Sequence, residues 1–266
     1  MGKKDLQTIT HLANIFKKYD APYLFLQLMF VYKEVKKGYF PQTHDNPQIK
    51  PIFEQEVAPL LKGLGLYVSF KHGGLVTGDE ALYKSWNGFG FYFRKKHFGS
   101  HYLGYPECCE LRFNIAEALL SFHLYYIIKR ILIDKDKEAA AKLDILIEDE
   151  MEIEEYQPCV VGCPRTHRRA QVFRGVRKEF SSFLPSDYLP GRKKIAKESL
   201  MVKLKPVNYR YTQRKMRRSL SFLKNKTMRE LFQLDDGFFQ EIEELLENPG
   251  SKRKLIATAE AYLKEM

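Results

Sequence analysis

Four cysteines are the residues of this chain whose type and spacing are best suited to chemistry. They form two clusters, the adjacent pair Cys108-Cys109 and the pair Cys159 and Cys163, and they are all the cysteines among 266 residues. Four thiolates satisfy both Zn(II) and an iron–sulfur cluster, because soft sulfur donors suit these metals. The sequence therefore predicts one metal centre, iron–sulfur or zinc, held by all four side chains.

The spacing of the two pairs fits a single zinc ion only in part. Cys159 and Cys163 have the short gap of structural zinc sites, whereas adjacent cysteines are strained partners for one tetrahedral ion. The adjacent thiolates could each bind a different iron of a cluster, or a histidine could complete the coordination. His97, His101 and His167 lie near the two pairs and are further candidate ligands, ranked below the cysteines.

Two other interpretations of the cysteines remain open at this point. Free cysteine is among the most commonly buried residue types, so all four could be ordinary core residues. Alternatively, a metal-free thiol oxidoreductase would use one low-pKa thiolate to attack a disulfide and a neighbouring thiol to resolve it. The sequence also leaves open whether a metal centre would be catalytic, with one vacant coordination position, or structural and closed.

Helix starts are expected to position three of the four thiols. Pro106 and Pro164 occupy the place that proline favours in a first helical turn, and apolar residues recur at spacings of three and four from Leu111 to Tyr126. Cys108, Cys109 and Cys163 would then lie at helix N-termini. Unpaired backbone N–H groups and the helix dipole stabilise thiolates there.

The remaining pattern predicts an α+β fold that is mainly helical, with a small sheet before the Cys-Cys helix. We expect a main domain over 1–183 that carries the cysteine site and a basic, mostly helical extension over 184–266. The expected helices are Leu6–Lys18, Pro22–Gly38, Ile52–Lys62 and Asp136–Glu150, a basic helix from Pro164, and further helices from Gln213 onwards; the expected strands are Gly65–Phe70, Gly90–Arg94 and an edge strand in Ser199–Tyr211, and Leu184–Gly191 is expected to be a loop.

The run Gly104-Tyr105-Pro106-Glu107-Cys108-Cys109, followed by Pro158-Cys159 and Cys163, resembles an uncharacterised prokaryotic family that is common in archaea. That family pairs a Gly-Tyr-Pro-x-Cys-Cys element with a Pro-Cys-x-x-x-Cys element, and the resemblance covers about Tyr67 to Phe180. The family is a domain of unknown function, so the resemblance implies no activity. It implies that the four cysteines belong to one site.

Charge is distributed unevenly along the chain, whose formal net charge is +11. The segment Arg192–Arg229 holds 14 basic residues and one acid, interleaved with aromatic residues, whereas Asp134–Glu155 holds ten acids and three lysines. Basic side chains neutralise phosphates and exposed aromatic rings stack on unpaired bases, so RNA or another polyanion is a candidate partner. Packing of the basic segment against the protein's own acidic segments is an equally good interpretation.

A second basic cluster follows the last cysteine directly. Here a bound anion would meet both a helix N-terminus and guanidinium groups, although a surface helix with arginines on its outer face is a somewhat better explanation of the pattern. The candidate anion- or nucleic-acid-binding residues of the two clusters are Arg165, Arg168, Arg169, Arg214, Lys215, Arg217 and Arg218.

The length of the apolar segments is the basis for predicting the cellular location of the protein. No apolar run approaches the roughly 18 to 20 residues that cross a bilayer, and the charged N-terminus has no apolar signal core. We therefore expect a cytoplasmic protein without membrane contact. The leading hypothesis is a metal centre beside a basic surface; the alternatives are a thiol oxidoreductase and an RNA-binding module with structural cysteines.

Overall fold

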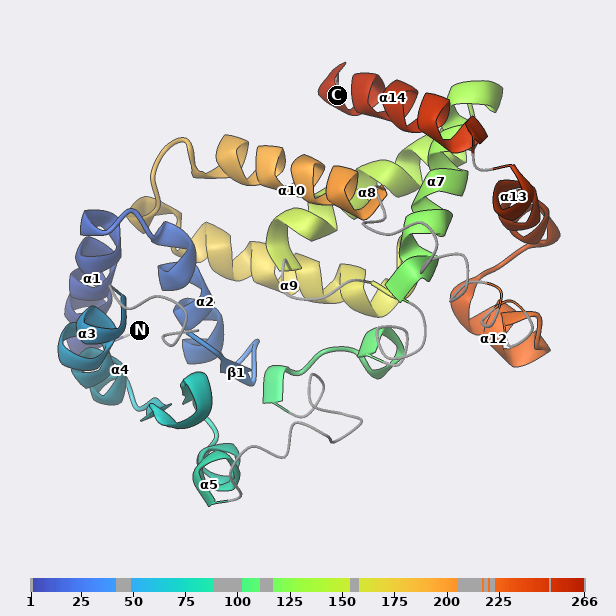
Figure 1. Ribbon diagram of the computed structural model, residues 1–266. Helices are drawn as coiled ribbons and strands as arrows, with labels where there is room; N and C mark the ends of the chain where they lie inside the picture. The colour runs from blue at the N-terminus through green and yellow to red at the C-terminus, as the bar shows by residue number, and fades with distance from the viewer. Residues whose placement is uncertain are drawn as a thin grey trace. The chain divides into compact units, whose positions relative to one another are not determined.

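The computed structural model is mainly helical and carries one small antiparallel sheet (Figure 1). This confirms the predicted mainly helical α+β class. The structure describes residues 2–41, 49–88, 102–110, 117–153, 158–204, 217, 220, 223–248 and 250–265.

The chain forms two compact units. Unit 1 comprises Met1–Tyr105 and Gln171–Tyr188, and unit 2 comprises Pro106–Ala170 and Leu189–Met266. All four cysteines belong to unit 2. Because a compact unit is not by itself an independently folding domain, the division into a domain 1–183 and an extension 184–266 stays a prediction.

Unit 1 is built on two N-terminal helices, α1 (Lys3–Lys18) and α2 (Pro22–Tyr32). α1 is amphipathic and buries one stripe of side chains, whereas α2 is apolar on nearly all sides and is buried from Phe25 to Val31. The predicted extension of α2 to Gly38 is wrong. The chain turns out of the helix at Glu34, whose φ is +58°, a left-handed conformation that a helix does not continue through.

The rest of the first segment of unit 1 combines short helices with the sheet. The helical segments are α3 (Ile49–Ile52), the π-helical turn η1 (Phe53–Val57), α4 (Ala58–Gly63), the 3₁₀ turn η2 (Lys71–Gly73) and α5 (Glu80–Gly88). The strands β1 (Gly38–Tyr39), β2 (Tyr67–Ser69) and β3 (Leu75–Thr77) pair antiparallel in the order β1-β3-β2. β2 confirms part of the predicted strand Gly65–Phe70, and the predicted strand Gly90–Arg94 lies outside the described residues.

Aromatic side chains from two distant segments form the core of unit 1. Phe30 of α2 stacks on Phe173 with ring centroids 4.3 Å apart, and Phe25 meets Phe180 edge to face at 6.2 Å. Phe173 lies on α9 (Pro164–Glu179), whose first residues belong to unit 2. The short helical turn η4 (Ser181–Phe183) follows. Burial of these rings gives unit 1 a hydrophobic core of its own.

In the part of unit 2 that the structure describes, all regular elements are helices, joined by turns and loops. Its acidic helix and the start of its basic helix appear where the sequence predicts them, and helices return near the C-terminus, with breaks before Asp236 and at Asn248. The helices are α7 (Glu117–Asp134), α8 (Lys137–Ile153), the first part of α9, α10 (Tyr188–Leu204), α12 (Lys226–Phe232), α13 (Asp236–Glu247) and α14 (Gly250–Glu265).

The predicted edge strand in Ser199–Tyr211 is wrong over its described part, which is the end of α10. Leu200 and Leu204 are buried at 0% and 2% exposure, while Val202 is 68% exposed. Residues four apart share a helix face and the residue between them points away, so the apolar alternation was misleading. The predicted loop Leu184–Gly191 also ends early, because Pro190 lies in the first turn of α10, where its missing N–H is tolerated.

Candidate metal centre

A short helical turn positions the first pair of cysteines. Residues 107–110 are helical, and the backbone N–H groups of Cys109 and Glu110 donate to the carbonyl of Pro106 at 2.9 and 3.1 Å. Pro106 precedes the turn directly, as the sequence predicts. Cys108 and Cys109 therefore lie in the first turn of this helical segment.

A tight loop positions the second pair, just before α9. Gly162 has a φ of +73°, a conformation that glycine adopts without strain, and the N–H of Cys163 donates to the carbonyl of Val160 at 3.2 Å. The carbonyl of Cys163 then accepts the N–H of His167 at 2.8 Å and so begins the hydrogen-bond pattern of α9. Cys163 is thus the residue immediately before the helix, as predicted from Pro164.

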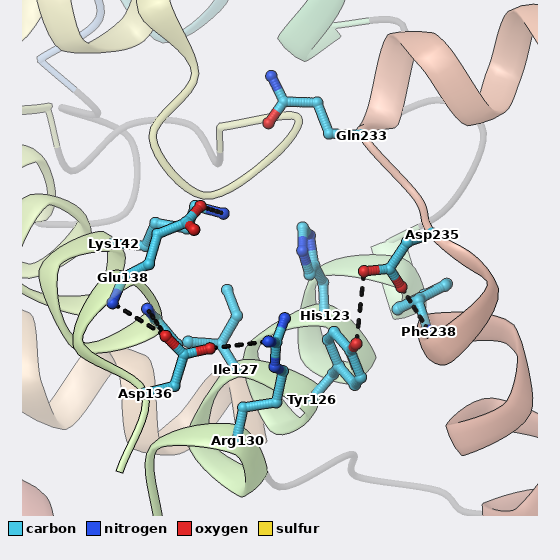
Figure 2. A pocket seen from close by; sticks show the side chains of 11 residues that line it. His123, Tyr126, Ile127, Arg130, Asp136, Glu138, Lys142, Gln233, Asp235 and Phe238 are labelled. Atoms are coloured by element: carbon cyan, nitrogen blue, oxygen red, sulfur yellow. Dashed lines mark hydrogen bonds and ion pairs between the residues drawn. The ribbon is translucent and has the colours of Figure 1, made fainter. Parts of the chain in front are cut away.

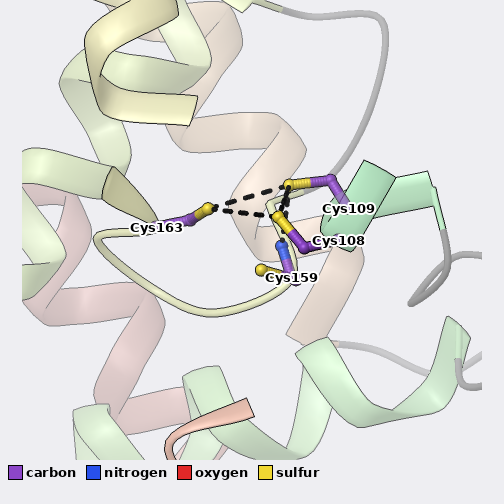
Figure 3. Close-up of side chains that lie close together, drawn as sticks. All are labelled: Cys108, Cys109, Cys159 and Cys163. Carbon is purple, nitrogen blue, oxygen red and sulfur yellow. Dashed lines mark hydrogen bonds between the residues drawn. The ribbon is translucent and has the colours of Figure 1, made fainter. Parts of the chain in front are cut away.

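The four side chains converge on one point (Figure 3). The Sγ atom of Cys163 lies 3.9 Å from that of Cys108 and 3.8 Å from that of Cys109, and the adjacent Sγ atoms of Cys108 and Cys109 are 3.8 Å apart. All four sulfur atoms, including that of Cys159, lie within 4.8 Å of one another. The sulfur atoms are close enough to bind one metal ion, and the adjacency of the first pair does not prevent this.

Burial and hydrogen bonds distinguish the four thiols. Cys109, Cys159 and Cys163 are buried, whereas Cys108 is half-buried. The Sγ atom of Cys109 accepts the backbone N–H of Cys159 at 3.4 Å and lies 3.1 Å from the hydroxyl oxygen of Thr166, which is completely buried. The site therefore supplies polar partners for sulfur as well as the sulfur ligands themselves.

The close approach of the thiols lowers the pKa of two of them and raises the pKa of the other two. Hydrogen bonds from Cys108, Cys109 and Cys159 lower the pKa of Cys163, and hydrogen bonds from Cys109 and Cys159 lower the pKa of Cys108 to about 7. The same interactions, together with burial, raise the pKa of Cys109 and of Cys159. A thiol that donates a hydrogen bond to a neighbouring thiolate keeps its proton, so negative charge favours Cys108 and Cys163 when no cation is bound.

Of the three histidines proposed as further ligands, the structure describes only His167, and His167 is not brought to this point. His97 and His101 lie outside the described residues. His167 is not part of the group of side chains within reach of one ion; its Nδ1 atom lies 3.0 Å from Oδ1 of Asp149, whose side chain is only 3% exposed. Among the residues that the structure describes, the candidate ligand set is therefore four cysteines.

Three of the predicted anion-binding residues follow Cys163 in the sequence and belong to the part of the chain that the structure describes. Arg165 and Arg168 are exposed in the first turns of α9, and Arg169 is half-buried. Arg217 is exposed, whereas Arg214, Lys215 and Arg218 lie outside the described residues. The two exposed arginines nearest Cys163 are thus accessible to a partner.

Sequence reasoning missed two features close to the centre along α9. Thr166 carried no distinctive signal, although it lies three residues after Cys163 and so within the same helical turn. The pairing of His167 with Asp149 joins α9 to the acidic helix α8, and no sequence spacing indicates it.

A small polar cavity of unit 2, also missed from the sequence, lies where α7, the start of α8 and the start of α13 meet (Figure 2). Its volume is about 60 Å³. The charged groups around it are paired: Arg130 lies 2.9 Å from Asp136, and the hydroxyl of Tyr126 donates to Asp235 at 3.4 Å. This pairing accounts for the polar lining as an internal network between helices.

No protein-family model, curated protein or solved structure matches this chain. The resemblance to the archaeal family therefore stays a prediction. Across the described residues, no helix combines the length and apolar character that a membrane span requires.

Proposed function

We propose that the protein binds a single zinc ion through the thiolates of Cys108, Cys109, Cys159 and Cys163. The sulfur spacing carries this proposal. Four thiolates around a tetrahedral zinc ion, with bonds of about 2.3 Å, lie about 3.8 Å apart. The three pairs among Cys108, Cys109 and Cys163 are separated by 3.8, 3.9 and 3.8 Å, and the pairs that include Cys159 lie within 4.8 Å.

An iron–sulfur cluster fits this spacing less well. Thiolates on different irons are separated by two metal–sulfur bonds and by the inorganic core between the irons, so they lie farther apart than thiolates on one ion. All six sulfur pairs here lie within 4.8 Å. A single iron ion would accept the same tetrahedron, and elemental analysis distinguishes it from zinc.

The proposed role of the centre is structural. Four thiolates fill all four positions of a tetrahedral ion and leave none for a substrate or an activated water. Three of the four ligands are buried, so solvent reaches the ion mainly from the side of Cys108. Zinc would join the 107–110 turn to the loop before α9, which are separated by about fifty residues, and so stabilise unit 2.

We further propose that this centre presents a basic surface to RNA or a similar polyanion. The observation that supports it is the exposure of Arg165 and Arg168 in the first turns after Cys163. By holding the loop before α9, the metal would fix the helix N-terminus next to these cations, and both features favour a phosphate.

Elemental analysis of anaerobically purified full-length protein tests the metal proposal. We expect about one zinc per chain, lost in Cys109→Ser and Cys163→Ser because each removes a ligand. Val160→Ala is the matched control: it truncates a side chain of the same loop that is 2% exposed, so it lowers stability while zinc is retained.

Three outcomes would contradict the proposal. Several irons with inorganic sulfide and broad visible absorption would indicate a cluster. Protein purified without metal that also fails to take up added zinc, and whose thiols reduce a model disulfide, would indicate a thiol oxidoreductase. Zinc retained at full stoichiometry in both serine variants would place the ion elsewhere.

A further inference from the structure

A second surface feature of unit 2 is independent of the cysteines. It is a groove of about 850 Å³ between α10 and α14, two helices that Figure 1 labels. α10 lines it with Pro190, Lys194, Lys197 and Met201, which recur at spacings of three and four and so share one helix face. The groove therefore runs along about three turns of α10.

Apolar side chains form much of the lining. Met201 and Val202 contribute from α10, and Leu263 contributes from α14. Val202 is 68% exposed. Covering an apolar side chain that is so exposed is favourable, because it removes apolar surface from water.

Lysines surround this apolar surface. Lys193, Lys194 and Lys197 of α10 and Lys264 of α14 line the groove, against two acids, Glu198 and Glu260. None of the four lysines forms an ion pair with any residue in the described part of the chain. Among the described residues, the rim of the groove thus carries four lysines against two acids, an excess of positive charge.

We propose that this groove binds an acidic amphipathic helix of a partner protein. Helices are commonly recognised by apolar grooves between two helices, with anchors at every third or fourth residue. Here the anchors would cover Met201 and Val202, and flanking carboxylates would pair with the rim lysines. A nucleic acid would pair with the same lysines, but its binding would not explain the apolar floor. Unpaired bases stack on aromatic side chains, and none is among the described lining residues.

Fluorescence anisotropy with full-length protein tests this proposal. The probe is a labelled helical peptide of about four turns, with leucine at every third or fourth position and glutamate on the remaining face. We expect saturable binding that weakens with salt and falls at least about tenfold in the double variant Lys194→Glu/Lys197→Glu. Val202→Asp, which changes the apolar floor rather than the rim, is expected to weaken binding by a similar factor.

Two controls make the result specific to the groove. Lys254→Glu reverses an exposed charge of α14 outside the groove and should leave affinity within about twofold. A scrambled peptide of the same composition, which has the charge without the amphipathic pattern, should bind at least about tenfold more weakly. Lys194, Val202 and Lys254 are exposed and Lys197 is half-buried, and circular dichroism checks that each variant retains its helices.

The proposal is overturned if the peptide does not bind, if the groove variants bind it as the unaltered protein does, or if the scrambled peptide binds equally well. It is also overturned if single-stranded oligouridylate binds in place of the peptide and is lost in Lys194→Glu/Lys197→Glu, which would identify the groove as a nucleic-acid site. Because the surface variants leave the cysteines unchanged, these results are independent of whether the protein contains zinc.

Discussion

At the scale of single residues, the candidate centre depends on four ligands and on one neighbour that is not a ligand. Thr166 is completely buried, and its hydroxyl oxygen lies 3.1 Å from Sγ of Cys109. When Cys109 is a thiolate, this hydroxyl is a donor and offsets part of the cost of burying negative charge. Groups that hydrogen-bond to a metal ligand orient it and affect metal affinity, so Thr166 should matter although it is not one of the candidate ligands.

Thr166→Val is predicted to weaken zinc binding about tenfold, because it removes the hydroxyl and keeps the shape of the side chain. Competition with a chromophoric chelator measures the affinity. Thr166→Ser, which restores the hydroxyl, should recover most of the loss. Equal affinity in the valine variant and the unaltered protein would show that the hydroxyl has no role at the centre.

At the scale of elements, α9 begins in unit 2, directly after Cys163, and its later turns belong to unit 1. Its first turns follow Cys163 and carry exposed arginines, and its later turns place Phe173 and Phe180, the residue just after the helix, in the core of unit 1. The later turns of this helix are therefore packed in a hydrophobic core, whereas its first turns carry exposed arginines. This arrangement is what the proposed polyanion surface requires.

The double variant Arg165→Glu/Arg168→Glu is predicted to weaken binding of single-stranded RNA about tenfold and to reduce the salt dependence of binding, because phosphate contacts are lost. Filter binding at several salt concentrations measures both effects. Lys178→Glu is the matched control, since it reverses an exposed charge in the last turn of the same helix. If the control weakens binding as much as the double variant does, the effect is one of net charge and not of this surface.

At the scale of the whole molecule, the four cysteines belong to one compact unit, and unit 1 has a separate aromatic core. The ligands come from two segments of unit 2 that are distant in sequence, so a bound ion would hold together the two ends of the stretch that contains α7 and α8. Among the described residues, the core cluster that contains the buried side chains of α1 and α2 consists of unit 1 residues and includes no cysteine. Metal removal should therefore have a local effect.

Removal of the metal with a chelator under reducing conditions is predicted to accelerate amide hydrogen exchange at residues 107–110 and 158–163, while exchange in α1 and α2 changes little. Mass-spectrometric hydrogen exchange of the full chain measures this pattern. The Cys109→Ser variant should exchange equally with and without chelator. Uniform acceleration along the chain would instead mean that the ion stabilises the whole molecule cooperatively.

The sequence by itself was sufficient to predict the candidate ligands, the helix starts at Pro106 and Pro164, and most of the helices. Cysteine chemistry, the preference of proline for first turns and the spacing of apolar residues are local properties that can be read without coordinates. The alternation of Leu200, Val202 and Leu204 was misread as a strand, because three apolar residues in alternation fit a short strand as well as a helix with one exposed position.

Only the tertiary structure decided that the four sulfur atoms meet within 4.8 Å, that His167 pairs with Asp149, and that Thr166 lies against Cys109. Each of these contacts depends on how helices and loops separated by tens of residues pack, and no local spacing encodes that. The groove between α10 and α14 has the same origin. The basic residues of α10 were evident from the sequence. Leu263, which lines the same groove, belongs to α14, and only folding brings the two helices together.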